Sequence, residues 1–434
     1  MRGGGIGRDP SGDAAAAGKL IDMETARRLS SAAAEQAARA SYGRLLALVS
    51  ARTRDIAAAE DALAEAFAAA LAQWGEQGVP ANPEAWLLTV ARRAAGHQWA
   101  RAATASRAED VLALLAEERE DTAASPFGDE RLALLFVCAH PAIDPDAQAP
   151  LMLQTVLGLD AARIAAAFLV SGATMGQRLV RAKRKIRDAG IAFAVPDVAE
   201  APQRLTAVLS AIYAAYGTAW DDTLGADSRL AGLRGEALFL ARLIAELMPE
   251  QAEALGLLSL ICHCEARQPA RRGADGAFVP LHAQDPQVWS RELVLEAEGA
   301  LRRAARFGAP GRFQTEAAIQ SLHAHQRMTG ERFTAPLARL YDVLAGFAPT
   351  TGVMVARAVA YAENGAWAAA LGQLRAMEGT ATYQPWWAAL ARISWLAGDA
   401  QGAADAAARA AGLSADPAIR AFLLGGGYRF QVGG

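Results

Sequence analysis

The sequence of 434 residues is long enough for two or three domains, and its 53% hydrophobic residues are enough to build their cores. The formal net charge of −3 neither favours nor excludes a nucleic-acid partner, because basic and acidic patches can cancel in the total. Three cysteines imply no disulfide framework, and we find neither an apolar stretch of about 18 residues nor a secretory signal at the start. These features predict a cytoplasmic protein with no membrane partner.

Alanine-rich amphipathic runs follow one another along the chain, and no stretch alternates β-branched and aromatic residues with polar ones. We therefore expect an all-α protein. Composition and helix breakers divide it into five parts: a disordered tail at 1–18, a helical domain at 19–103, an acidic linker at 104–128, a second helical domain at 129–195 and a larger one at 197–434.

A first helix with a distinct pattern is predicted from Ala57 to Trp74. Leu63, Phe67 and Leu71 recur in it at helical spacing, which marks them as its core face. Its acidic residues project elsewhere, and the residues alone favour an ordinary solvated face for them. These acidic residues are Glu60, Asp61 and Glu65.

The segment from Ala85 to Ala108 contains no acidic residue. Its positive or titratable side chains include Arg92, Arg93, His97 and Arg101, with Trp86 and Trp99 nearby. Cations interleaved with aromatic rings suit a separated DNA strand, because rings stack on exposed bases and arginines neutralise phosphates. We expect Trp86 in the core instead, since it stands at helix spacing from Val90.

Only three lysines occur in the chain, and two of them, Lys183 and Lys185, stand in the basic segment 173–190. On a helix, Met175, Leu179, Ala182 and Ile186 form a narrow apolar stripe opposite the cations. A short helix is predicted at 160–170 with Asp160 as its N-cap, and Ser171 can cap the helix that follows. Two short helices joined in this way predict a helix-turn-helix.

The second helix of such a motif enters the major groove, where its first residues contact bases and the surrounding cations contact phosphates. The candidate base readers are Thr174, Gln177 and Arg178. The candidate phosphate contacts are Arg181, Lys183, Arg184 and Lys185. The alternative is a solvated basic helix end, since cations near a helix C-terminus favour its dipole.

Residues 360–374 and 394–408 superpose at an offset of 33, which pairs Gly365 with Gly398 and Ala370 with Ala403. This offset is close to the roughly 34-residue period of tetratricopeptide (TPR) helix pairs. An alanine-rich helical chain can also give such a match by chance, so both interpretations stay open.

A metal site at Cys262 and Cys264 is not expected, because residues two apart on a helix point in divergent directions. His282, His323 and His325 lie downstream but do not change this expectation. No glycine-rich phosphate loop, nucleophile elbow or paired-carboxylate motif is visible either. We therefore expect no enzymatic activity, no cofactor and no metal.

Residues 129–196, with the helix-turn-helix pattern, resemble the second DNA-binding domain of extracytoplasmic function (ECF) sigma factors, in particular the subgroup with a long helical C-terminal extension. "AAAEDALAEAFAAALAQW" and "NPEAWLLTVARRAA" resemble the polymerase-binding and promoter-melting helices of the same family. The resemblance continues past residue 196, through "LSAIYAAYGTAW" and "DGAFVPLHAQDPQVW", and so covers nearly the whole chain.

This resemblance implies two sigma-type helical domains followed by a TPR-like domain. It implies that Glu60, Asp61 and Glu65 contact core RNA polymerase, and that the acidic linker approaches the RNA-exit path, although a solvated linker is an equal alternative. The sequence departs from the family at three places. Ala64 replaces a common glutamine, and Arg93 and His97 replace an asparagine and an aspartate, so base preference at the minus-ten element does not carry over.

The sequence therefore predicts a sigma factor that binds core RNA polymerase and promoter DNA. Its C-terminal domain, with balanced charge, is expected to contact protein, either another part of this chain or a separate partner. The alternative function is a helix-turn-helix regulator with a repeat scaffold that does not bind core polymerase.

Overall fold

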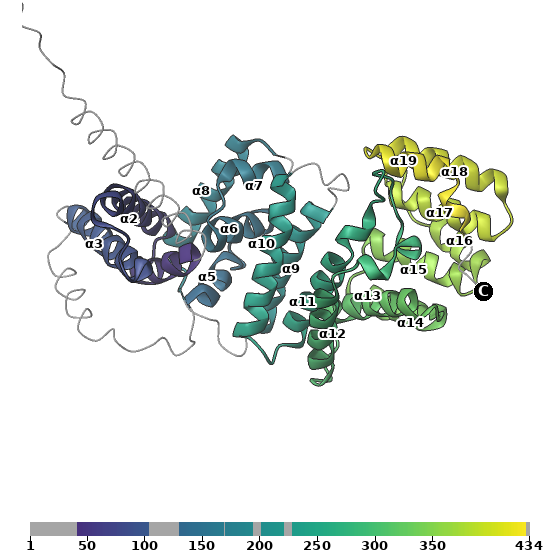
Figure 1. Cartoon of the computed structure of the whole chain (residues 1–434), viewed down its shortest axis with the longest axis horizontal. Coiled ribbons are helices and arrows are strands. Elements are labelled where there is room, and N and C mark those ends of the chain that lie inside the picture. The colour runs from purple at the N-terminus through teal and green to yellow at the C-terminus, as the bar shows by residue number, and fades with distance from the viewer. Residues whose placement is uncertain (1–40, 104–129, 169, 194–200, 221–227, 431–434) are drawn as a thin grey trace, which may run out of the picture. The chain divides into compact units, whose positions relative to one another are not determined.

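The computed structural model describes residues 41–103, 130–168, 170–193, 201–220 and 228–430. Within these ranges every regular element is a helix, apart from one isolated antiparallel bridge between Arg272 and Phe278. The expected all-α fold is confirmed. The chain divides into two compact units, Met1–Ala215 and Tyr216–Gly434, called unit 1 and unit 2 below (Figure 1).

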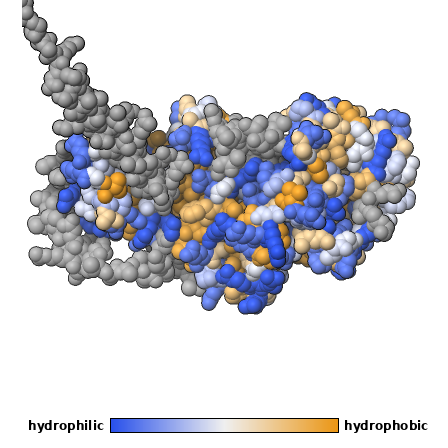
Figure 2. Space-filling view, viewed as in Figure 1, coloured by the Kyte–Doolittle hydropathy of each residue, from blue (hydrophilic) through white to orange (hydrophobic). Residues whose placement is uncertain are grey.

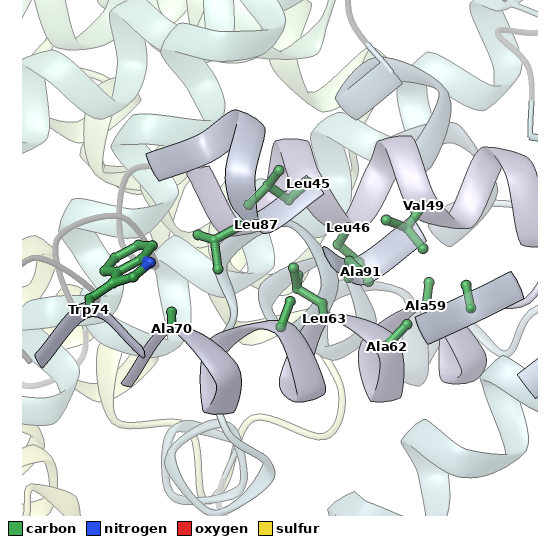
Figure 3. Close-up of a cluster of buried hydrophobic side chains, with 12 residues drawn as sticks. Leu45, Leu46, Val49, Ala59, Ala62, Leu63, Ala70, Trp74, Leu87 and Ala91 are labelled. Atoms are coloured by element: carbon green, nitrogen blue, oxygen red, sulfur yellow. The ribbon is translucent and has the colours of Figure 1, made fainter. Parts of the chain in front are cut away.

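The described part of unit 1 starts with three helices, at 41–53, α2 at Ile56–Gln77 and α3 at Pro83–Ala103. Asp55 caps α2 by accepting a hydrogen bond from the Ala57 amide at 2.9 Å, and Asn82 caps α3 by accepting one from the Ala85 amide at 3.0 Å. Their shared core, drawn in Figure 3, brings together Leu45, Leu63 and Leu87. α2 and α3 thus each start at a capping side chain, and a common apolar cluster holds the three helices together.

The core face of α2 differs from the sequence prediction at one position. Leu63 is fully buried and Phe67 packs against the core, as predicted, but Leu71 is 52% exposed. Beyond Leu63 the buried stripe instead follows Ala66, Ala70 and Trp74, because alanines let the neighbouring helices approach closely. The prediction for Trp86 is confirmed, since it packs edge-on against Trp74 with ring centroids 5.4 Å apart.

Four further helices complete most of unit 1: α5 at Glu130–Cys138, α6 at Pro145–Leu157, α7 at Ala161–Ala167 and α8 at Gly172–Asp188. The predicted caps are confirmed, because the side chain of Asp160 accepts from the Arg163 amide at 2.8 Å and that of Ser171 from the Thr174 amide at 3.1 Å. The predicted apolar stripe of α8 is confirmed as well. Its buried members are Met175, Leu179, Ala182 and Ile186.

The helix at 41–53 packs closely against the end of α6. A Cβ atom added at Gly43 would lie 2.0 Å from the carbonyl oxygen of Val156, so no other residue fits there without displacing backbone. Gly158, which ends α6 in the left-handed conformation, approaches the ring of Tyr42. These contacts join the first three helices to the α5–α8 group. The next helix, α9 at Ala201–Trp220, donates a hydrogen bond from Arg204 to the Phe136 carbonyl at 2.8 Å.

The first part of unit 2 is built around α11 at Ala252–Ala266, which is buried along most of its length. The other elements are α10 at Ser228–Leu247, η1 at Gln268–Arg271, η2 at Leu281–Ala283, η3 at Pro286–Val288, α12 at Arg291–Ala305, α13 at Arg312–Thr329 and α14 at Thr334–Phe347. Glu253 on α11 accepts hydrogen bonds from the amides of Phe313 and Gln314, both at 2.9 Å. A side chain from another helix thus caps α13, whose own N-cap is a glycine.

The rest of unit 2 comprises α15 at Thr351–Glu363, α16 at Trp367–Arg375, α17 at Gln384–Leu396, α18 at Ala400–Leu413, α19 at Pro417–Leu424 and η4 at Gly427–Arg429. The predicted repeat corresponds to two helix pairs, α15–α16 and α17–α18. Gly365 and Gly398 both have positive φ in the turns, at 92° and 83°. The next residue of each turn donates a hydrogen bond five residues back at 2.9 Å, from Ala366 to Tyr361 and from Asp399 to Ser394. The two turns are therefore built alike.

Candidate nucleic-acid interface

The start of α8 presents polar side chains outward. Ser171, which caps the helix, also forms a hydrogen bond of 2.8 Å with the hydroxyl of Thr174. Thr174 and Gln177 are exposed, and Arg178 is partly buried beside them. Because the opposite face of the helix is anchored in the core by its apolar stripe, these three side chains share an outward-facing surface at the first two turns of α8.

The cations further along α8 differ in their surroundings. Arg181 and Lys185 are exposed. Arg184, with 72% of its side chain exposed, is paired with Asp188 at 3.1 Å. Arg187 approaches the same aspartate at 3.2 Å and Asp55, the N-cap of α2, at 3.7 Å. Surface pairs of this kind contribute little energy, so Arg184 remains able to turn toward a phosphate.

Lys183 differs from the other cations because it turns inward. Its Nζ lies 2.5 Å from Oε2 of Glu60 on α2, and the two side chains are only 10% and 20% exposed. The other carboxylate oxygen of Glu60 is also buried and has no hydrogen-bond partner among the described residues. The ion pair therefore lies between α8 and α2 in a largely water-excluded place.

The pKa values of Glu60 and of the neighbouring Tyr42 are both shifted. Burial raises the pKa of Glu60 above its usual value, while the charge of Lys183 and its hydrogen bond act in the opposite direction. The pKa of Tyr42 is also raised, first by burial and then by the negative charge of Glu60. Burial thus raises the pKa of Glu60 by more than Lys183 lowers it, and Lys183 is the main group that favours the charged form of Glu60.

The remaining predicted residues of α2 and α3 lie on the surface where they are described. Asp61 and Glu65 are exposed on α2, and Arg92 and Arg93 are exposed on α3. His97 and Arg101 belong to α3, but their side chains lie outside the described residues. The acidic linker at 104–128 and the tail at 1–18 lie outside them as well. Exposed cations therefore occur on both α3 and α8.

Sequence reasoning missed both ion pairs between α2 and α8. Glu60 and Lys183 are 123 positions apart, and no local pattern relates them. Arg187 stood in the basic run but carried no predicted role, and only the structure shows that it approaches the cap of α2.

The cysteines and histidines form no metal centre where they are described. Cys138, Cys262 and Cys264 are buried free thiols. Across the described ranges, no three side chains of His, Cys, Asp or Glu are grouped so that they could hold a metal ion.

No described helix is both long enough and apolar enough to cross a bilayer. On the face drawn in Figure 2, hydrophilic and hydrophobic residues are interspersed.

Comparison with known proteins gives two family matches. Residues 38–104, which include α2 and α3, match sigma-70 region 2. Residues 204–305 match a family of unknown function (DUF6596). An uncharacterized protein of Rhizobium meliloti (strain 1021) is 36% identical over 301 residues, which cover 68% of this chain and 71% of that protein. The chain belongs to the same family as this protein.

The match to sigma-70 region 2 supports membership among the sigma factors, which are non-enzymatic transcription factors. It implies interaction with core RNA polymerase and promoter DNA. The matched segment contains all three residues predicted to contact the polymerase and the four DNA-contact candidates of α3, whereas the other DNA-contact candidates lie on α8. No solved structure matches the chain.

Proposed function

We propose that this chain is an ECF-type RNA polymerase sigma factor that binds core polymerase and directs transcription from specific promoters. The observation that carries the proposal is the coincidence of two features in unit 1. A sigma-70 region 2 match covers α2 and α3, and a capped, basic helix, α8, follows a short helix and turn further along the chain. A sigma factor needs one such element for promoter melting and another for upstream recognition.

Within region 2, the proposed role of Arg92, Arg93, His97 and Arg101 is to hold the separated promoter strand. The exposure of Arg92 and Arg93 on α3 supports this role, because both guanidinium groups can reach phosphates. Glu60, Asp61 and Glu65 are proposed to contact basic groups of the polymerase. The exposure of Asp61 and Glu65 supports that role, whereas Glu60 is occupied by Lys183.

We propose that α7 and α8 act as a helix-turn-helix. Thr174, Gln177 and Arg178 would read bases, since they lie on the outward face of the first two turns. Arg181, Arg184 and Lys185 would hold phosphates without reading sequence. Lys183 can do so only after it leaves Glu60, and Glu60 can meet the polymerase only after the same separation. The two proposed roles therefore require this ion pair to break.

For the rest of the chain we propose the domain limits 19–103, 129–195 and 197–434, with TPR-like helix pairs in the last. The matching turns of α15–α16 and α17–α18 support the repeat assignment. Stacked helix pairs present surfaces that suit protein contact, so a regulatory or protein-binding role is proposed for this part. A cytoplasmic location follows from the proposed partners.

Copurification tests the proposal against the alternative of a regulator that ignores the polymerase core. Tagged protein should retain the core polymerase subunits of its own host, and the variant with Asp61→Lys and Glu65→Lys should retain less. The matched control, Glu246→Lys, changes an exposed acidic residue of unit 2 and should retain as much as the unaltered protein. Absence of polymerase from the unaltered protein would favour the alternative.

A further inference from the structure

Unit 2 contains a cavity of about 680 Å³. It lies among α13, α14 and α15, and is closed by the short helix η2 and by Phe430 near the end of the chain. We call it the α13–α15 cavity. Its volume falls within the roughly 300–1,000 Å³ typical of small-molecule sites. Every residue that lines it belongs to unit 2, so the cavity is a property of one compact body.

One wall is fixed by contacts that need no ligand. Arg392 donates from Nε to Glu363 at 2.7 Å, and from Nη1 to the carbonyls of Tyr428 and Phe430 at 3.1 and 2.6 Å. Its guanidinium also lies 3.6 Å from the centre of the Phe430 ring, and that ring stacks on His282 at 3.7 Å. Arg392 thus fastens the end of the chain over the cavity and keeps the wall in place.

The lining combines an apolar surface with a few polar groups. Its aliphatic residues are Leu281, Leu337, Ala356, Val359 and Ala360, and its uncharged polar residues include His282, His323, Gln326 and Tyr341. Burial lowers the pKa of both histidines to about 4, with the positive charge of Arg392 as a second cause at His282, so both imidazoles are neutral at pH 7. Burial raises the pKa of Tyr341 to about 12.

One polar atom of this lining lacks a partner. The Oε1 atom of Gln326 is buried and accepts no hydrogen bond from any described residue. Leaving such an acceptor unsatisfied is costly, and a donor on a bound molecule would remove that cost.

The charges around the cavity do not cancel. Its lining carries Arg327, Arg332 and Glu363, but the carboxylate of Glu363 is already paired with Arg392, which stands outside the lining. Two cations therefore remain without a compensating carboxylate in the lining. Arg327 is held in position by donating from Nε to the Gln284 carbonyl at 2.6 Å, and Arg332 is exposed. An anionic group on a ligand would meet both.

We propose that the α13–α15 cavity binds an apolar small molecule that carries one carboxylate. The apolar body lies against Leu337, Val359 and Ala360, and the carboxylate faces Arg327 and Arg332. Either an aromatic acid or a branched aliphatic acid satisfies this chemistry. The proposal is independent of the sigma-factor function, because it uses only unit 2.

Fluorescence titration of the full-length chain tests the class of ligand. The probe is 8-anilinonaphthalene-1-sulfonate, an apolar aromatic anion whose emission rises in dry surroundings. It should bind saturably at one site, and 1-naphthoate should displace it roughly tenfold better than 1-naphthamide, which has the same shape without the charge. Equal displacement by both compounds, or a lack of saturable binding, would overturn the proposal.

Two pairs of variants test the place. Ala356→Phe fills the cavity and should abolish probe binding, whereas Ala368→Phe, at an exposed alanine of α16, should not. Arg332→Gln should weaken displacement by 1-naphthoate severalfold and leave 1-naphthamide unchanged, whereas Arg306→Gln, an exposed cation at the end of α12, should change neither. Circular dichroism checks that each variant is folded. Unchanged probe binding in folded Ala356→Phe would refute the site. If Ala356→Phe does not fold, the test is Arg332→Gln, and unchanged displacement by 1-naphthoate in that variant would refute the site.

Discussion

Replacing Lys183 by methionine should loosen the packing of α8 against α2. Methionine keeps most of the length of the lysine stem but removes the ammonium that bonds Glu60. The carboxylate would then be left without a partner, in a site where its side chain is only 20% exposed. Breaking a buried pair in this way costs roughly 3–5 kcal/mol. Because Glu60 keeps some solvent contact and can take up a proton, we expect a loss of about 2–4 kcal/mol.

The stability lost in Lys183→Met should depend on pH. The pKa of Glu60 is already above its usual value, and loss of Lys183 removes the main influence that lowers it. A carboxyl group with a raised pKa in the folded state stabilises the fold fully below its unfolded pKa, and loses that contribution as pH rises through the folded pKa. The deficit of Lys183→Met should therefore be largest near neutral pH and shrink as the pH falls through the raised pKa of Glu60.

Hydrogen exchange measured by mass spectrometry reports this loss locally. Amides of α8 and α2 in Lys183→Met should exchange faster by an amount equivalent to about 2–4 kcal/mol, once intrinsic rates are corrected for pH. The control is Lys185→Met, an exposed lysine two residues away, which should change protection by less than about 0.5 kcal/mol. Adding Glu60→Gln to Lys183→Met should restore much of the protection. If the two single lysine variants behave alike, the ion pair does not hold α8 against α2.

Four further predictions concern the proposed function. Arg178→Ala or Gln177→Ala should change discrimination among upstream promoter variants by about 1–3 kcal/mol, and equal affinities across such variants would remove these residues as readers. Lys185→Ala should instead weaken binding to all sequences alike and reduce the salt slope by roughly one unit, measured by fluorescence anisotropy at several salt concentrations. Residues 197–434 expressed alone should be soluble and helical by circular dichroism and should not bind promoter DNA. A protein that ends near Pro196 should still bind promoter DNA but transcribe with altered strength, and unchanged transcription in vitro and in cells would refute a regulatory role for the C-terminal part.

The features that the sequence predicted correctly are local ones. The apolar stripe of α8 and the caps at Asp160 and Ser171 depend on spacing within a few residues, so periodicity and capping chemistry were sufficient. The turns at Gly365 and Gly398 were found because a turn with positive φ favours glycine in both copies of the repeat.

The errors and omissions arise from packing between distant segments. Leu71 was assigned to the core because it recurs at helical spacing from Leu63 and Phe67, but alanines form most of the buried stripe of α2 and leave that leucine at the surface. The bond between Lys183 and Glu60 depends on how α8 meets α2, which no local pattern encodes. The α13–α15 cavity likewise needs Phe430 brought against η2 by Arg392, and the sequence gives no sign of that contact.

Transcription with purified components tests the central claim most directly. Core RNA polymerase from the host of this chain is incubated with genomic DNA fragments, with and without the protein, and the 5′ ends of the transcripts are sequenced. The account predicts new, discrete start sites that share upstream elements and disappear when Arg92 and Arg93 are both changed to glutamate, but persist when Arg302 and Arg303, exposed cations of α12, are changed in the same way. No new start sites with an active core enzyme would contradict the assignment of this chain as a sigma factor.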